Sequence, residues 1–375
     1  MEKVNIEELS FQPQDKGVKE YHTLIHITDK ELTFNEQLEL ILNTFEKLQQ
    51  DRTDHACPVF VRVFLSDAAN QAALVTTRMA QYSCALSLVE QPPLDGSKIA
   101  FWIYWMTDVT IERSNDGLVE VTHEGHYKHL WQGCAVNPSD DSHLQTYHLL
   151  EDYTQKLKKR NLTLADNCMR TWFFVQNVDV NYAGVVKGRN EIFARENLTP
   201  KTHFIASTGI GGRHADPKIK VIMDSYAIDG IRPEQIHYLY APSHLNPTYE
   251  YGVSFERGTY IDYADRRHVF ISGTASINNK GEIVHQGQVA LQVERLWENV
   301  ETLLKEADCT FDNVCHMLVY LRDIGDYTVV RKKFEQRFPQ TPKIFLWAPV
   351  CRPGWLVEME CMATKPILDQ RFKSF

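Results

Sequence analysis

The heptapeptide VEMECMA at residues 357–363 repeats the apolar and acidic pattern of the heptapeptide VIMDSYA at residues 221–227. Both alternate in the manner of a β-strand, so equivalent positions place their side chains on the same face. One equivalent position holds Ile222 in the first copy and Glu358 in the second. An acid in place of an apolar side chain breaks the local pattern, and such breaks concentrate at functional sites. The pair therefore indicates a repeated fold and a candidate acid.

The match between the two copies continues upstream and extends to a third copy. The matching segments are 131–135 with 271–275, 149–160 with 292–307, 172–177 with 319–323, and the Thr-Pro-Lys segments 199–201 with 341–343. A more divergent copy begins the chain, with a helix at about 35–49, a strand at 60–65 and a later strand at 98–106. Because these elements recur in the same order, they indicate an internal triplication.

Each copy alternates short strands with amphipathic helices, which predicts an α+β unit with a mixed sheet and helices on one face. The other face of each sheet must be buried, and the other two copies are its natural partners. We therefore expect three units to form a pseudo-trimer within one chain. The expected domains are 1–128 (divergent first repeat), 129–230 (middle repeat), 231–265 (aromatic-rich insert) and 266–375 (last repeat).

Composition narrows the class of protein. The chain has 375 residues, of which 43% are hydrophobic and 24% charged, as expected of a soluble globular protein. It contains no apolar run long enough to span a membrane, and its polar, acidic start does not resemble a signal peptide. Eight cysteines without a CxxC pair indicate free thiols in a reducing cytoplasm. A net charge of −9 without a basic run argues against nucleic acid as the main partner.

The segment His123-Glu124-Gly125-His126-Tyr127-Lys128-His129 resembles a metal-binding pattern only superficially. On a strand, His123 and His129 share a face while His126 points the other way, so the three imidazoles are not expected to converge. We therefore predict no metal site there.

The last copy, residues 269–363, resembles the Rid (YjgF-like) superfamily through its ISGTAS opening, its LVYLRDI strand and its VEMECMA ending. Members of that superfamily are usually homotrimers that bind small carboxylates in the clefts between subunits. They often carry a glutamate in the final strand, which corresponds to Glu358. The whole chain resembles the chorismatases, which are Rid-fold enzymes with extra N-terminal repeats. The segments ASTGIGG (206–212), SFER (254–257), CRP (351–353) and LVE (356–358) carry that resemblance.

The chorismatase resemblance implies that the protein releases pyruvate from chorismate, without a cofactor, as a monomer. The reaction begins by protonating the methylene carbon of an enol ether, which needs an acid that stays protonated near neutral pH. Glu358 is the candidate, because Trp347, Trp355 and Met359 nearby offer apolar walls that would raise its pKa. The alternative is a glutamate at a strand edge that faces water, as we expect for Glu360.

Chorismate carries two carboxylates, which favours arginine clamps. Arg352 and Arg257 lie inside the matching motifs, and Arg213 ends the glycine-rich turn; each is otherwise an ordinary solvated surface charge. The remaining substrate-binding candidates are Ser207, Thr208, Gly209 and Gly211 of that turn, and Tyr240 of the aromatic insert. The turn residues lack bulk and could offer backbone N–H groups to a carboxylate. A plain turn between strands explains these glycines equally well.

Cys351 is the second catalytic candidate. In chorismatases a cysteine at this position, with glycine in the STGIG loop, goes with 3-hydroxybenzoate as the product, whereas alanine goes with a dihydroxy-cyclohexadiene carboxylate. The resemblance therefore implies the 3-hydroxybenzoate type. Two other functions stay open: a Rid-type imine or enamine deaminase in which Glu358 holds water, and a non-enzymatic protein that binds a small ligand or associates with RNA.

Overall fold

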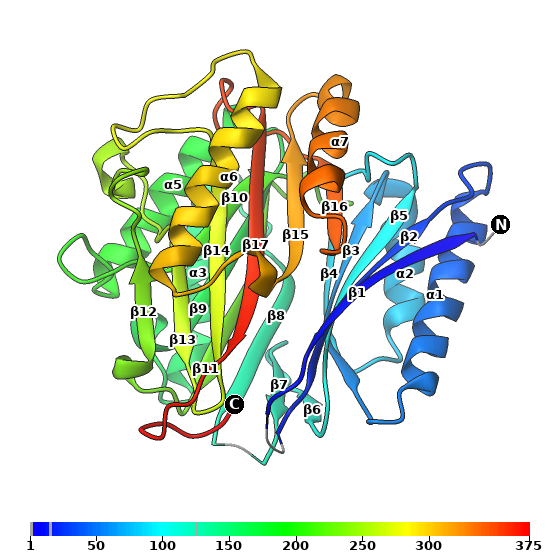
Figure 1. Ribbon diagram of the computed structural model, residues 1–375, viewed down its shortest axis with the longest axis horizontal. Helices are drawn as coiled ribbons and strands as arrows, with labels where there is room; N and C mark the ends of the chain where they lie inside the picture. The colour runs from blue at the N-terminus through cyan, green and yellow to red at the C-terminus, as the bar shows by residue number, and fades with distance from the viewer. Residues whose placement is uncertain (1–2, 15–16, 125) are drawn as a thin grey trace.

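A computed structural model describes residues 3–14, 17–124 and 126–375 of the chain. Its strands form three mixed sheets, which follow one another along the sequence. The sheets have five, six and six strands, and helices cover each of them (Figure 1). The α+β fold predicted from the repeats is confirmed.

The first unit contains the elements that the divergent copy predicts. Its elements are β1 (Val4–Phe11), β2 (Glu20–Ile27), α1 (Phe34–Asp51), β3 (Cys57–Leu65), α2 (Ala68–Met79), β4 (Ala85–Glu90) and β5 (Ile99–Met106). Helix α1 begins with a capping box, in which the Thr33 hydroxyl and the Glu36 carboxylate each bond the other residue's backbone N–H. The predicted helix at 35–49 is therefore α1, and the strands predicted at 60–65 and 98–106 are β3 and β5.

The middle and last units follow the same plan. The middle elements are β6 (Thr110–Arg113), β7 (Val119–Thr122), β8 (Lys128–Val136), α3 (Ser142–Lys158), α4 (Leu164–Asn167), β9 (Cys168–Val175), α5 (Val178–Arg195), β10 (Ala206–Gly211) and β11 (Val221–Asp229). The last elements are β12 (Ile236–Leu239), β13 (Gly258–Asp262), β14 (Arg266–Ala275), α6 (Val289–Glu306), β15 (Val314–Leu321), α7 (Tyr327–Arg337), β16 (Lys343–Trp347) and β17 (Val357–Pro366). Short 3-10 turns at Pro233–Gln235, Thr248–Tyr251, Phe311–Asn313 and Ile324–Asp326 complete the structure.

Strand order demonstrates the triplication directly. The sheets contain the equivalent runs β4-β3-β5-β2, β10-β9-β11-β8 and β16-β15-β17-β14. In each run the first pair is parallel and the next two are antiparallel. Strands β6 and β7 extend the middle sheet, and β12 and β13 extend the last sheet. The first two strands lie within the segment assigned above to the first repeat, and the other two within the aromatic-rich insert; the division into four domains stays a prediction.

The core lies between the sheets, and the helices lie outside them (Figure 1). Helices α1 and α2 pack on the outer face of the first sheet, and α3 and α5 on that of the second. The inner faces meet in one aromatic core that includes Trp102, Trp131, Trp172 and Phe270. The three units therefore form a pseudo-trimer in which each sheet is buried by its neighbours.

Two buried ion pairs repeat the same contact between successive units. Arg62 of β3 donates to Asp224 of β11 at 2.8 Å, and Arg170 of β9 donates to Glu360 of β17 at 2.6 Å. All four side chains are buried. The prediction that Glu360 faces water is wrong. Glu360 is buried, and its ion-pair partner Arg170 comes from another unit. A charge buried at this depth needs such a partner to offset its lost hydration.

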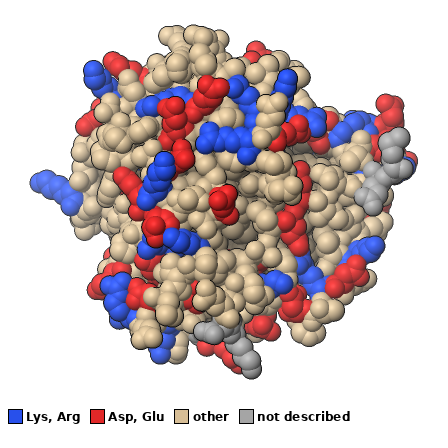
Figure 2. All heavy atoms as spheres, viewed as in Figure 1, with Lys and Arg blue, Asp and Glu red and all other residues tan. Residues whose placement is uncertain are grey.

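The surface charges and the positions of the histidines concern two functions that the sequence argues against, nucleic-acid binding and metal binding. Lys and Arg side chains are interspersed with Asp and Glu on the face that Figure 2 displays. The histidines His123 and His129 do meet, with their Nε2 atoms 3.1 Å apart, because His123 follows β7 and His129 lies on β8, which pairs with β7. Within 3–14, 17–124 and 126–375, no three potential metal ligands gather at one point, and no helix is long and apolar enough to cross a membrane.

Candidate active site

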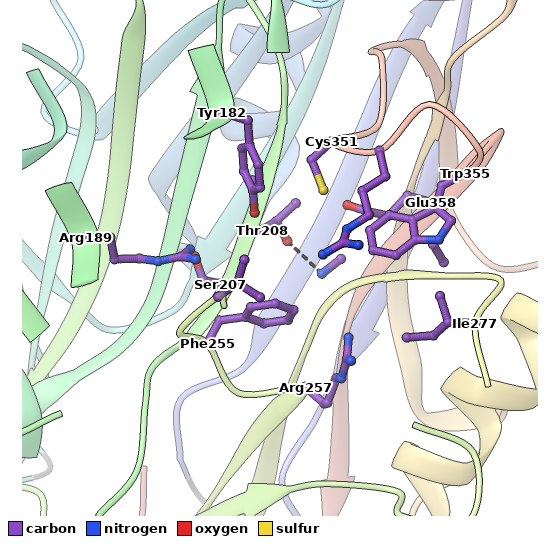
Figure 3. Close-up of a pocket in the computed structure, with 15 residues that line it drawn as sticks. Tyr182, Arg189, Ser207, Thr208, Phe255, Arg257, Ile277, Cys351, Trp355 and Glu358 are labelled. Carbon is purple, nitrogen blue, oxygen red and sulfur yellow. Dashed lines mark hydrogen bonds between the residues drawn. The ribbon is translucent and has the colours of Figure 1, made fainter. Parts of the chain in front are cut away.

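A partly open pocket lies between the middle and last units. Strand β10 forms one wall, and β14 with the loop before β17 forms the other (Figure 3). Hydrogen bonds join the walls: the Ser207 N–H donates to the Ser272 hydroxyl, and the Gly273 N–H donates to Thr208 Oγ1, both at 2.9 Å. A concave site at a junction between units, lined by apolar side chains and a few polar groups, is typical of a small-molecule site.

Most of the residues predicted from the motifs line this one cavity. They are Ser207, Thr208, Gly209, Arg257, Cys351, Arg352 and Glu358. Apolar walls come from Trp355, Ile277 and Phe255. The structure thus brings together segments that are far apart in the sequence.

Three predicted residues lie elsewhere. Arg213 follows β10 beyond the cavity, where its side chain is 54% exposed and forms an ion pair with Glu90 of the first unit at 3.0 Å. Gly211 faces Pro349 near the same point, and both it and Arg213 line a different hollow. Tyr240 is half-exposed and lines a neighbouring pocket with Tyr249. The placement of Arg213 follows from a long-range ion pair that the glycine-rich motif does not encode.

Glu358 is 4% exposed, and its carboxyl receives no hydrogen bond from the described part of the chain. Burial is the main cause that raises the pKa of Glu358, to about 8, and the negative charge of Glu360 is the second. Gly273 makes room for the side chain, because a Cβ there would lie 2.2 Å from Oε1 of Glu358. The cavity therefore holds a carboxylic acid that keeps its proton at neutral pH.

Glu360, two residues further along the same face of β17, has the opposite environment. Its carboxylate accepts hydrogen bonds from Arg170 at 2.6 Å, the Trp172 indole at 2.9 Å and the Tyr320 hydroxyl at 3.0 Å, and also from the Thr208 hydroxyl. Neighbouring carboxyls in such different surroundings are how proteins divide the roles of proton donor and fixed anion. Of these two carboxyl groups, that of Glu358 lines the cavity and that of Glu360 does not.

Three arginines line the cavity, and sequence reasoning identified two of them. Arg257 is buried and donates to the backbone and side-chain oxygens of Asn246 at 3.0 and 3.2 Å. Arg352 lies over the Trp355 ring, 5.3 Å from its centroid. The third, Arg189 of α5, is 1% exposed, and its Nε and Nη2 have no hydrogen-bond partner among the described residues. A buried guanidinium with unused donors beside a cavity is suited to an anionic ligand.

Tyr182 and Arg189 were both missed by sequence reasoning. They lie on α5 about two turns apart, so both project from one face of the helix toward the cavity (Figure 3). The available signal was a charged residue on the otherwise buried face of a helix, beside Val185 and Ile192. That signal is weak in one sequence, because a long arginine side chain often reaches solvent from such a position.

Cys351 belongs to a small cluster at one end of the cavity. Burial raises the pKa of its thiol to about 12, so the sulfur stays protonated, and Tyr182 hydrogen-bonds to it. A Cβ at Gly209 would lie 2.7 Å from the Tyr182 ring. Gly209 therefore lets the tyrosine approach, and the tyrosine in turn contacts the thiol.

Comparison with known proteins identifies the last unit. The family model described as Endoribonuclease L-PSP matches residues 256–365. A RutC family protein of Pyrococcus abyssi is 30% identical over 100 residues, which span 26% of this chain and 78% of that relative. The chain belongs to the RutC family. The 3-aminoacrylate deaminase RutC of Acinetobacter baylyi is 24% identical over 97 residues, or 25% of this chain and 77% of that protein.

The likeness to one solved structure extends over most of the chain. A chorismatase crystal structure superposes with a TM-score of 0.65, covering 82% of this RutC-family chain and 93% of the other, at 19% sequence identity. At that identity the likeness concerns the fold alone. It shows that the arrangement of three units in one chain occurs in another protein.

Proposed function

We propose that this RutC-family protein is a chorismatase that releases pyruvate from chorismate. The observation that carries the proposal is the protonated Glu358, buried in a cavity that Arg189, Arg257 and Arg352 also line. Chorismate needs both features, because it has two carboxylates to bind and an enol ether carbon to protonate. The fold that the chain shares with a solved chorismatase supports this choice.

The proposed reaction begins when the Glu358 proton moves to the methylene carbon of the enolpyruvyl group. That carbon becomes a methyl group, and the ether carbon becomes an oxocarbenium ion while Glu358 becomes a carboxylate. Water adds to this ion and gives one proton back to Glu358, which forms a hemiketal. The bond between the hemiketal carbon and the ring oxygen then breaks, and the hemiketal hydroxyl proton passes to the ring oxygen, which gives pyruvate and a dihydroxy-cyclohexadiene carboxylate. The arginines fix the substrate by its carboxylates, so that the reacting carbon is held beside the acid.

We propose 3-hydroxybenzoate as the ring product, with Cys351 acting after the first proton transfer. Chorismate contains all the atoms of pyruvate and 3-hydroxybenzoate, so this route consumes no water overall. The support is the cluster of Cys351, Tyr182 and Gly209, together with the chorismatase pattern that pairs this cysteine with a glycine. Cys351→Ala is expected to keep pyruvate release and divert the ring product to the dihydroxy acid, as chromatography of the products would show. An unchanged product mixture would rule out this role.

A second candidate is an imine or enamine deaminase. The relative from Acinetobacter baylyi, a 3-aminoacrylate deaminase, favours it. The two functions are separated by incubating the purified protein with chorismate and with 3-aminoacrylate, and by measuring pyruvate from the first and ammonia from the second. We expect pyruvate from chorismate; ammonia release without any turnover of chorismate would reverse the choice.

A further inference from the structure

The carboxyl side chains of Glu358 and Glu360 share one face of β17, and the proposed function uses only Glu358. Glu358 lines the cavity without a hydrogen bond from any described residue, whereas Glu360 lies behind it and is held by four donors. We propose that Glu360 is a positioning residue for the proton of Glu358: its fixed negative charge keeps the neighbouring carboxyl protonated and ready to donate. The catalytic meaning of this inference rests on the proposed function.

The charge of Glu360 is fixed because its donors come from three strands of two units. Arg170 and Trp172 belong to β9, Thr208 to β10 and Tyr320 to β15. A second guanidinium, that of Arg62 on β3, lies 3.7 Å from its Oε1. Each of these side chains is buried, so the carboxylate can neither turn toward solvent nor exchange its partners for water.

Thr208 sets the direction of hydrogen bonding between the two acids. Its hydroxyl donates to Glu360, and its oxygen accepts the N–H of Gly273. The hydroxyl proton is thus directed to Glu360 and not to Glu358. Thr208 lines the cavity and contacts Glu360. Because its hydroxyl proton is directed to Glu360, Thr208 does not stabilise the ionised form of Glu358 by a hydrogen bond.

The other charged groups near Glu358 act in both directions. Arg257 and Arg170 favour its ionised form, while burial and Glu360 oppose it, and the opposing effects prevail. Arg189 and Arg352 line the same cavity from α5 and from the loop before β17. Burial raises the pKa of the neighbouring Cys351 thiol to about 12, so it carries no charge at neutral pH. A dianionic substrate that binds the arginines would offset their positive charge, so the influence of Glu360 on the proton persists in the complex.

The middle unit provides a matched control. Asp224 on β11 is equivalent to Glu360, and it likewise accepts from a buried arginine of the preceding unit, Arg62. The position equivalent to Glu358 is Ile222. Neutralising Asp224 therefore removes the closer partner of a buried arginine, as neutralising Glu360 does, and leaves Arg62 with Glu360 at 3.7 Å. It removes no charge from the strand that carries the acid.

The test measures the protonation of Glu358 without substrate. Its protonated carboxyl gives an infrared C=O band, which is isolated by subtracting the spectrum of the matching Glu358→Gln protein and followed as pH rises. In Glu360→Gln we expect the midpoint to fall by about one pH unit or more, because a neutral side chain no longer repels the ionised form. In Asp224→Asn we expect the midpoint of the unaltered protein. An unmoved midpoint in Glu360→Gln, or an equal shift in both variants, would overturn the proposal.

The same variants separate this inference from the proposed function. Pyruvate release from chorismate should be lost as pH rises through the Glu358 midpoint, and in Glu360→Gln this loss should move to lower pH while the rate at low pH is retained. If the infrared midpoint shifts but the unaltered protein does not consume chorismate, the role of Glu360 stands and the function fails. Should Glu360→Gln not fold, the pair Arg170→Gln/Glu360→Gln replaces it and is compared with Arg170→Gln alone, because Arg170 and Glu360 act on Glu358 in opposite directions. A lower midpoint in the pair than in the single variant supports the proposal, and equal midpoints reject it.

Discussion

Glu358, the proposed proton donor, reduces the stability of the folded protein at neutral pH. Its pKa of about 8 in the folded protein lies above the usual value of a glutamate. The folded state therefore binds a proton that the unfolded chain has lost, and the stability that this provides disappears as pH rises from the unfolded value toward the folded one. The acid is retained at that position although an apolar side chain would pack there, as Ile222 does in the middle unit.

Replacing Glu358 by glutamine should have opposite effects on activity and on stability. Pyruvate release should fall by about 10²-fold or more, because the amide has the same shape but cannot deliver the proton. The free energy of unfolding should decline less between about pH 5 and 8 than in the unaltered protein, by on the order of 3 kcal/mol. Urea titrations at both pH values measure this difference. Equal pH dependence in the two proteins would show that Glu358 is ionised throughout.

Arg189→Met should weaken substrate binding and leave the folded protein at least as stable. The methionine keeps the aliphatic stem but removes a buried charge whose Nε and Nη2 have no hydrogen-bond partner among the described residues. We expect kcat/KM for chorismate to fall about 10²-fold, in line with the loss of a charged hydrogen-bond partner. Arg213→Met is the control, because Arg213 is exposed and paired with Glu90 outside the cavity. Comparable kinetics in both variants would remove Arg189 from the site.

At the residue scale, the sequence could predict which residues of one short motif lie close together. It could not predict burial that depends on a partner distant in the sequence. Glu358, Cys351 and Arg352 lie within one loop and strand, so their proximity follows from local geometry. The burial of Glu360 depends on Arg170, which lies in another unit. No local pattern distinguishes such a glutamate from one that faces water.

At the scale of elements, the cavity depends on the close approach of β10 to β14. The Gly273 N–H reaches Thr208 at 2.9 Å, and the absence of a Cβ at Gly273 leaves the space that the Glu358 carboxyl occupies. Gly273→Ala should therefore displace Glu358 without removing any functional group. We expect pyruvate release to fall by about 10²-fold, close to the effect of losing the acid itself. Gly287→Ala, at a glycine with nothing within 4 Å of its Cβ position, is unsuitable as a control because its φ is +72°.

The better control for Gly273→Ala is Gly325→Ala, where the added Cβ would meet only the Asp323 carboxylate, at 3.2 Å. That glycine lies in the turn before α7, outside the cavity lining. Its replacement should leave pyruvate release close to that of the unaltered protein. Retained activity in Gly273→Ala would mean that Glu358 tolerates another position, and that the acid is less constrained than the close approach implies.

The elements themselves were largely predictable, because periodic apolar positions and capping residues specify them locally. The core strands and the first helix of each unit occur where the repeats place them. Sheet membership was harder to predict: β6 and β12 are short edge strands, and β7 and β13 are the short strands beside them, so their pairing is decided by neighbours in space. Helix α5, which supplies Arg189 and Tyr182, was not delimited beforehand.

At the scale of the whole molecule, the contacts between units determine both stability and the place of the site. One cavity occurs where β10 of the middle unit meets β14 of the last, and that junction buries the pair Arg170–Glu360. The junction between the first and middle units buries the pair Arg62–Asp224. Removing one member of a buried pair leaves an uncompensated charge, whereas replacing both by apolar residues of similar size is often nearly neutral. The Arg62–Asp224 pair allows this to be tested while Arg170, the closer partner of Glu360, is kept.

Arg62→Met should destabilise the protein by about 3–5 kcal/mol, because Asp224 would keep only its hydrogen bond from the Cys134 N–H among the contacts that hold it. The double variant Arg62→Met/Asp224→Leu should recover most of that loss, although it gives up the same Cys134 bond. Denaturant unfolding of the single and double variants measures both effects. Since all three sheets share one core, we expect each protein to unfold in a single transition. Separate transitions for the units, or a double variant no more stable than Arg62→Met, would show that the buried pairs do not couple the three units.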